Sequence, residues 1–213
     1  MKKITIIIAL AGIYTMAGAQ NQKYIAAMEK NIAVLDTTRD AKVLQNEANT
    51  FERIGSAEKA EWLPQYYAAY CYVNMTYSTK GNDIDTYCDK AEAFLNKADS
   101  LNPNNSEIYT LKAQVASARI SVNPMSRGQK YGTMAAEIRE KAKKLDPTNP
   151  RPFYLEGTGF FYTPPMFGGG KDKAKPSFEK AKELFAAFKP ASSIAPHWGL
   201  GSTEYFLKKC EEK

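Results

Sequence analysis

Three glycines and a lysine, Gly168 to Lys171, form the stretch that is most like a phosphate-binding loop. In such a loop, backbone amides and the lysine surround a phosphate, and a serine or threonine follows the lysine. The pattern also needs a glycine that is separated from the Gly-Lys pair by four residues. Pro165 and Asp172 occupy those two places, and we predict no strand before the run. We therefore interpret the glycines as a tight turn that starts the next helix.

Few side chains have the neighbours that catalysis or metal binding requires. His197 is the single histidine, and an isolated histidine is more often a capping or packing residue than a base. Glu156 lies among aromatic residues, and we interpret it as a solvated or paired carboxylate. Cys71, Cys88 and Cys210 form no CxxC pair, and one histidine is too few to complete a cysteine–histidine zinc site. The sequence therefore predicts no enzyme activity, no metal and no cofactor.

The cysteines leave one covalent question open. Cys71 and Cys88 fall in neighbouring predicted helices, so a disulfide bond between them is geometrically possible. The favoured alternative is that both are small buried apolar side chains. An odd number of cysteines means either one bridge and a spare thiol or no bridge at all.

Aromatic residues are concentrated in two stretches that can contact a ligand. Between residues 62 and 77 the tyrosines can line a pocket, because a phenol ring combines flat apolar area with a polar tip. We interpret Tyr67 and Tyr70 as packing residues and Tyr66 as the groove candidate. The second stretch is the loop from Tyr162 to Lys171, whose apolar residues either fold back as a plug or form a contact surface. We favour the plug.

The first residues have the features of an exported protein. Two lysines precede an apolar run, and Ala17-Gly18-Ala19 follows as a cleavage site, so we assign residues 1–19 as a signal peptide. The run is shorter than the roughly 20 residues that span a bilayer, and no other membrane segment is predicted. The mature chain, 20–213, is expected to be one periplasmic or secreted domain. Its charges alternate in sign along the helices, which disfavours a nucleic-acid partner.

The elements that position these residues are all predicted to be helices. Three helices precede residue 80, and others follow at 84–101, 106–122, 129–145 and 152–161. The next helix carries Ala174 and Phe178, and a final one carries Trp198, Leu200, Tyr205, Phe206 and Leu207. Because no segment shows sustained alternation of apolar and polar residues, we predict no strands and an all-α fold.

Small residues and prolines recur at matched places along these helices. Asn102-Pro103 and Asp146-Pro147 each end a helix, and the two prolines are 44 residues apart. Small side chains let paired helices approach closely, and aromatic residues fill the space between pairs. The positions that carry the pattern are Ala91, Ala98, Pro103, Tyr109, Ala113, Ala135, Ala142, Pro147, Phe153, Gly157, Ala174, Phe178 and Ala181.

This pattern resembles the tetratricopeptide repeat, most specifically from Ala91 to Phe161. The resemblance implies a right-handed α-hairpin solenoid of three to four repeats, and long insertions explain a period of 44 where the family has 34. Arg139 stands where a large apolar residue is usual. Members of the family bind extended peptides on the concave face. The corresponding positions here are Glu107, Thr110, Gln114 and Ser117 in one unit and Arg151, Tyr154, Thr158 and Phe161 in the next, and Tyr66 is added to this groove as the candidate from the tyrosine stretch.

Some members of the family clamp a peptide carboxylate with lysine and asparagine. Thr110 and Tyr154 replace the lysine here, and Gln114 and Thr158 replace the asparagine, so we expect no such clamp. The first hypothesis is a non-enzymatic interaction module that holds an unknown protein or peptide on its concave face. The alternative is a periplasmic small-ligand-binding protein, which resembles the helical accessory component of certain transport systems.

Overall fold

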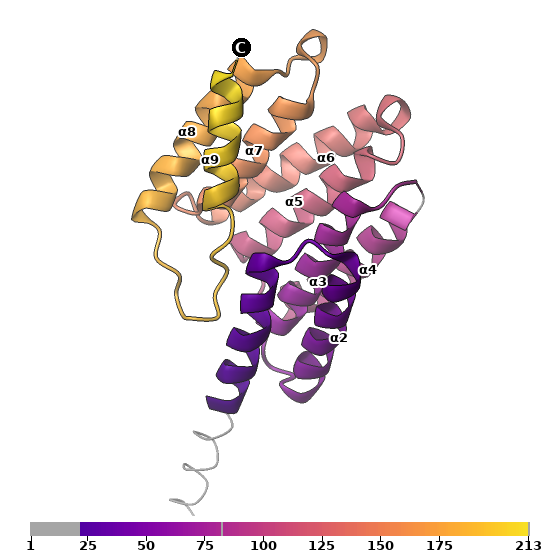
Figure 1. The fold of residues 1–213 in the computed structure, drawn as a ribbon, viewed down its shortest axis with the longest axis vertical. Coiled ribbons are helices and arrows are strands. Elements are labelled where there is room, and N and C mark those ends of the chain that lie inside the picture. The colour runs from indigo at the N-terminus through magenta and orange to yellow at the C-terminus, as the bar shows by residue number, and fades with distance from the viewer. Residues whose placement is uncertain (1–21, 82, 213) are drawn as a thin grey trace, which may run out of the picture.

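The computed structural model describes residues 22–81 and 83–212, so the expected signal peptide lies outside the described residues. Within them the chain is all-α and contains no strand, as predicted (Figure 1). A helix over 22–37 is followed by α2 (Ala41–Ala57), α3 (Leu63–Met75), the short η1 (Thr76–Ser78), α4 (Asp83–Leu101), α5 (Ser106–Ile120), α6 (Pro124–Leu145), α7 (Pro150–Tyr162), η2 (Pro165–Phe167), α8 (Lys171–Ala187) and α9 (Leu200–Glu211).

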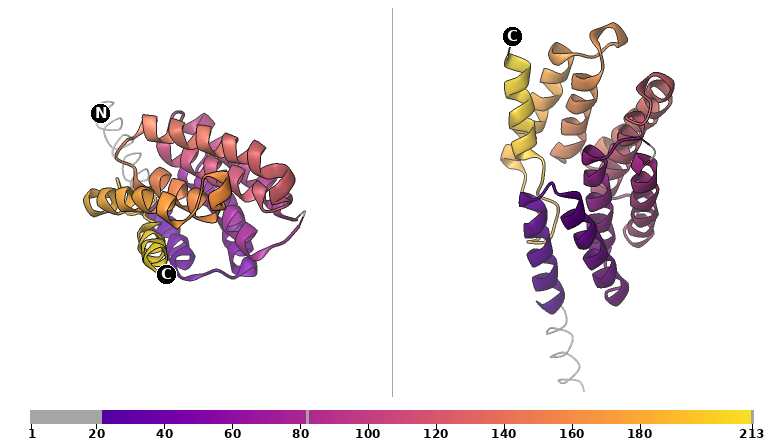
Figure 2. Two further views of the ribbon diagram at one scale, coloured as in Figure 1. Left: turned by 90° about the horizontal axis from the view of Figure 1, so that it is seen from above. Right: turned by 45° about the vertical axis from the view of Figure 1, so that its right-hand side comes forward.

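Each helix from α2 to α8 packs against the next helix in the chain. In addition, α3 contacts α5 and α5 contacts α7, so alternate helices form a second set of neighbours. The helix over 22–37 joins the core through Tyr24, Met28, Ile32 and Leu35. Figures 1 and 2 place α7, α8 and α9 together at one side of the molecule and α2, α3 and α4 at another.

Short polar side chains fix where several helices begin. Asp40, Asn105, Asn123 and Asn149 each accept hydrogen bonds from backbone amides of the first turn that follows. These caps satisfy amides that have no partner inside the helix. The hydroxyl of Thr38 accepts from the amide of Asp40, one step before the helix.

The connection between α5 and α6 is shorter than the sequence suggested. We expected Asn123-Pro124 to open a long connection and the next helix to begin near residue 129. Pro124 is instead the first residue of α6, where its missing amide costs nothing and its fixed φ suits the helix. The helix therefore includes Gly128 and Gly132, two residues of low helix propensity.

The small residues of the repeat pattern are buried at helix crossings. Ala91, Ala98, Ala142 and Ala174 are completely buried. A β-carbon added to Gly157 would lie 2.5 Å from the ring of Phe178, so α7 and α8 approach closely only because that position has no side chain. Cys71 and Cys88 are also buried, and both are free thiols.

The loop between α7 and α8 does not act as a plug. Tyr162, Met166 and Phe167 are 73%, 82% and 64% exposed. The amide of Gly170 donates to the carbonyl oxygen of Phe160 at 2.8 Å, and Gly168 adopts the left-handed conformation. These features close the loop on itself and turn its apolar side chains outward. No helix of the described chain is both long and apolar enough to cross a bilayer.

Candidate ligand-binding site

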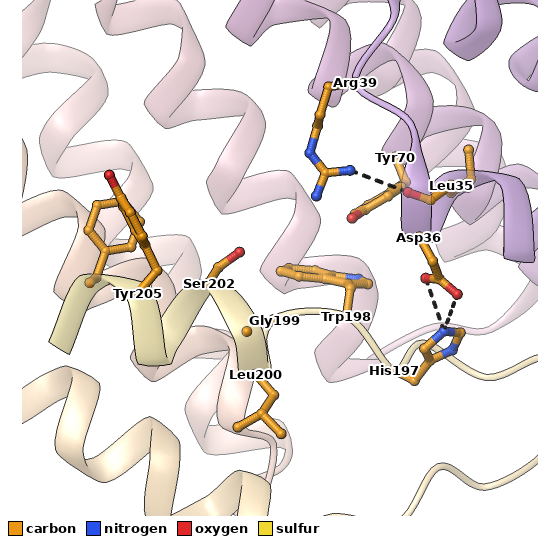
Figure 3. A pocket seen from close by; sticks show the side chains of 12 residues that line it. Leu35, Asp36, Arg39, Tyr70, His197, Trp198, Gly199, Leu200, Ser202 and Tyr205 are labelled. Atoms are coloured by element: carbon orange, nitrogen blue, oxygen red, sulfur yellow. Dashed lines mark hydrogen bonds and ion pairs between the residues drawn. The ribbon is translucent and has the colours of Figure 1, made fainter. Parts of the chain in front are cut away.

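A pocket of about 410 Å³ lies where the end of the helix over 22–37 meets α3 and the beginning of α9 (Figure 3). Residues from both ends of the described chain therefore share one site. Its lining consists of Leu35, Asp36, Arg39, Tyr70, His197, Trp198, Gly199, Leu200, Gly201, Ser202, Tyr205 and Phe206.

Trp198 forms an aromatic wall of the pocket. Its ring centroid lies 5.4 Å from that of Tyr70 and 6.3 Å from that of Tyr154, and its indole nitrogen donates to the hydroxyl of Tyr66 at 2.9 Å. Gly199 follows with φ of 116°, a conformation that L side chains rarely adopt. This glycine lets the chain turn directly from the wall into α9.

A second set of rings continues the wall along α9. Phe206 is its centre, with ring centroids of Phe161 at 5.1 Å and Tyr162 at 5.9 Å, and it stacks on Phe178 at 5.3 Å. Tyr205, which is 55% exposed, packs edge-on against Phe206. We call Tyr70, Tyr154, Trp198, Tyr205 and Phe206 the aromatic cleft.

The phenols of this region are neutral hydrogen-bond donors at ordinary pH. Burial raises the pKa of Tyr70 to about 12, although the charge of Arg39 opposes the shift. Burial also raises the pKa of Tyr154, and the neighbouring phenols of Tyr77 and Tyr162 raise it further. Tyr77 accepts a 2.6 Å hydrogen bond from the side-chain nitrogen of Gln114.

Charged side chains stand at the rim of the pocket. Arg39 donates to the carbonyl oxygens of Leu35 and Thr38 and has no carboxylate partner among the described residues. In Figure 3 its guanidinium lies on the same side of the pocket as Tyr70. The Nε2 atom of His197 lies 3.2 Å from both carboxylate oxygens of Asp36. The free cation of Arg39 is thus the group best suited to an anionic ligand.

The site offers little to a bare metal ion. The described residues contain no cluster of three or more histidine, cysteine, aspartate or glutamate side chains that could hold one. Besides its contact with Asp36, His197 places Nδ1 3.3 Å from the carbonyl oxygen of Ala195. Both ring nitrogens therefore already face protein atoms.

Several residues predicted for the groove are not on a surface. Tyr66, Thr110 and Arg151 are completely buried, and Gln114 is 7% exposed. Arg151 forms a 2.8 Å ion pair with Glu107 behind the aromatic cleft. Residues 188–199 fold back over Tyr66 on α3 and Arg151 on α7. Thr110 and Gln114 lie on α5, where their side chains bond to Ser106 and Tyr77. None of the four lines the pocket.

The remaining groove residues divide into two groups. Tyr154 and Phe161 are half-buried and belong to the rings around the cleft, whereas the hydroxyl of Thr158 donates to the carbonyl oxygen of Leu155. Tyr67 is buried as expected, and Tyr70, which we assigned to packing, packs against the core and also lines the pocket.

The residues of the polar rim and of α9 were not among those predicted to form a binding site. Arg39, Asp36, Ser202 and Tyr205 carry no motif, and they come together only because the two ends of the described chain meet. The aromatic residues after His197 were a usable signal, since Trp198, Tyr205 and Phe206 follow one another at helical spacing.

A solved structure shares both sequence and fold with this chain. It is the HusA haemophore from Porphyromonas gingivalis, with 37% sequence identity and a TM-score of 0.81 over 88% of this chain and 92% of the other. No family model matches the chain, so the resemblance to the tetratricopeptide repeat stays a prediction. No curated protein sequence matches it either.

Proposed function

Since the chain belongs to the family of the HusA haemophore, we propose that it is a non-enzymatic, exported binding protein whose ligand is a haem-type porphyrin. The observation that carries the proposal is identity of 37% along almost the whole of both chains. It favours the small-ligand alternative over a protein partner on the concave face. The burial of Tyr66, Thr110 and Arg151 points the same way, because these residues cannot contact a docked peptide.

The chemistry of the aromatic cleft fits a flat macrocycle with acidic edges. Porphyrin rings are planar and apolar, so they bind well against aromatic faces such as those of Trp198, Tyr70 and Phe206. The propionate groups of haem need a cation or hydrogen-bond donors, and Arg39 at the rim supplies a guanidinium that pairs with no carboxylate in the part of the chain that the structure describes.

The donors present fit the macrocycle better than the iron. Asp36 and the carbonyl oxygen of Ala195 occupy the two nitrogens of His197, and the phenols of Tyr70 and Tyr154 are kept protonated by burial. A neutral phenol is a poor iron ligand. We therefore expect most of the affinity to come from contact with the ring system and its carboxylates.

Titration of the mature chain, residues 20–213, with haemin and with metal-free protoporphyrin IX tests this function. We expect saturable binding of both, seen as a change in the Soret band and as quenching of tryptophan emission. Trp198→Ala should weaken both by about tenfold or more, because it removes one face of the cleft. Trp62→Ala is the matched control, since Trp62 does not line the pocket. Absence of saturable binding to either porphyrin would refute the function.

We also propose that the helices form a right-handed stack of tetratricopeptide-type hairpins. The contacts of α3 with α5 and of α5 with α7 support it, because the first helices of successive hairpins are neighbours in such a stack. In this arrangement α3, α5 and α7 supply the inner face, and α9 covers part of it.

A further inference from the structure

The segment between α8 and α9, residues 188–199, carries the wall of the cleft but has almost no regular structure of its own. One backbone hydrogen bond closes a turn within it, from the amide of Ala195 to Ser192. In Figure 1 it forms the long loop that descends beside the helix over 22–37. Since a segment of this kind has many accessible conformations, other parts of the chain must hold Trp198 in place.

Three side-chain contacts tie this segment to buried parts of other helices. The hydroxyl of Tyr67 donates to the carbonyl oxygen of Ile194 at 3.0 Å. The Nη2 atom of Arg151 donates to the carbonyl oxygen of Pro196 at 2.7 Å. Tyr66 accepts the hydrogen bond of Trp198 itself. Two of these anchors come from α3 and one from α7.

Arg151 contacts both ends of the segment with a single group. Its guanidinium carbon lies 4.7 Å from the ring centroid of Phe188 and 5.3 Å from that of Trp198. The other terminal nitrogen, Nη1, donates to Glu107 on α5 at 2.8 Å. A planar cation can stack on aromatic faces and donate at its edges at the same time, which an ammonium cannot do.

The energetics of the pair suggest a role other than stability. The side chain of Arg151 is completely buried, and among the described residues its Nε atom and Oε2 of Glu107 have no hydrogen-bond partner. Burial raises the pKa of Glu107 to about 7 although Arg151 lies beside it. Apolar residues of similar size are often as stable as a buried ion pair or more so. Stability alone therefore does not explain why the pair is here.

We propose that Arg151, oriented by Glu107, is a positioning residue that holds Trp198 as the wall of the aromatic cleft. This inference rests on the proposed porphyrin-binding function for its effect on affinity. Its structural content is independent of any ligand, because it states which residue fixes the indole in the free protein. Arg151 itself does not reach the porphyrin, since it is buried behind Trp198.

The first experiment replaces the pair by apolar residues. In Glu107→Leu/Arg151→Met we expect a melting temperature at or above that of the wild type, together with a loss of affinity for protoporphyrin IX of about tenfold. The control is Lys112→Met/Asp99→Leu, which removes a 2.7 Å ion pair between α4 and α5 that is distant from the segment. It should leave affinity within about twofold. Unchanged affinity in the folded test variant would overturn the proposal.

The second experiment needs no ligand. In a Trp62→Phe background Trp198 is the only tryptophan, and its quenching by acrylamide reports how well the indole is held. We expect the quenching constant to rise at least about twofold in the apolar variant and by less in Arg151→Lys, which keeps the charge but loses the planar fork. If the double variant fails to fold, Arg151→Lys alone provides the test. Equal quenching in wild type and Arg151→Lys would then count against the proposal. A wild type that binds no porphyrin would refute the proposed function and leave this measurement valid.

Discussion

The indole nitrogen of Trp198 donates a 2.9 Å hydrogen bond to the hydroxyl of Tyr66, across 132 residues of sequence. Tyr66 is completely buried on α3, where it also packs edge-on against Tyr67 at 5.3 Å. The bond therefore joins the core of the first helices to the beginning of α9. A contact of this length in sequence forms only when the last part of the chain has folded.

Removal of the Tyr66 hydroxyl should loosen this junction. We expect Tyr66→Phe to lower the free energy of unfolding by about 1–3 kcal/mol, because it leaves the half-buried indole N–H without an acceptor. Urea denaturation followed by circular dichroism measures the change. Tyr87→Phe is the control, since the Tyr87 hydroxyl makes no hydrogen bond among the described residues and its ring stacking on Tyr72 is kept. Equal effects of both substitutions would argue against the importance of the hydrogen bond.

Arg39 should distinguish ligands by their carboxylates. Arg39→Gln is expected to reduce affinity for protoporphyrin IX by about threefold to tenfold, through loss of one exposed charged hydrogen bond. Affinity for the dimethyl ester of the same porphyrin should stay unchanged. Arg53→Gln serves as control, because Arg53 is an exposed arginine of α2 outside the pocket. If the ester lost affinity to the same degree, Arg39 would not be the propionate contact.

Gly157 and Gly128 should respond in opposite directions to the same substitution. Gly157→Ala places a methyl group 2.5 Å from the ring of Phe178, so we expect a loss of about 1–3 kcal/mol in stability. Gly128 lies within α6 with no heavy atom within 4 Å of an added β-carbon. Gly128→Ala should therefore stabilise the protein by about 0.5–1 kcal/mol. Thermal melts of the two variants test the pair, and stabilisation by Gly157→Ala would contradict the close packing of α7 on α8.

Glu156 should contribute to stability only above acidic pH. Burial raises the pKa of this carboxyl, but hydrogen bonds from Lys143 and Ser177 and the charges of Lys143 and Arg139 together outweigh burial and hold the pKa below its ordinary value of 4.5. The folded state therefore favours the ionised form, so the contribution is complete above 4.5 and is lost as the pH falls through the lowered pKa. The difference in unfolding free energy between wild type and Glu156→Gln should be constant from pH 7 to 5 and shrink below 4.5. A difference that grew on acidification would reverse the assigned shift.

Local sequence patterns predicted the helices and their close crossings because both depend on neighbouring residues. Ala98 before Asn102-Pro103 and Ala142 before Asp146-Pro147 indicated where helices pack and end, and both alanines are buried. The start of α6 was misplaced because Gly128 and Gly132 favour a loop locally, whereas the cap at Asn123 and Pro124 in the first turn stabilise a helix.

The candidate site was harder to predict because it depends on contacts between distant segments. We predicted that Tyr66 and Arg151 line a groove. The repeat pattern does not show that residues 188–199 fold over their helices and bury both side chains. Arg39 was missed for the same reason, since it becomes part of a pocket only when α9 lies beside the first helices.

The pocket takes its lining from residues 35–39, from Tyr70 and from residues 197–206, so it is complete only when these distant segments have come together. A nascent polypeptide that still lacks its last segment presents the α3 half of the cavity and no opposing wall. For the proposed porphyrin ligand, capture therefore requires residues 197–206 to be folded against α3 and the helix over 22–37.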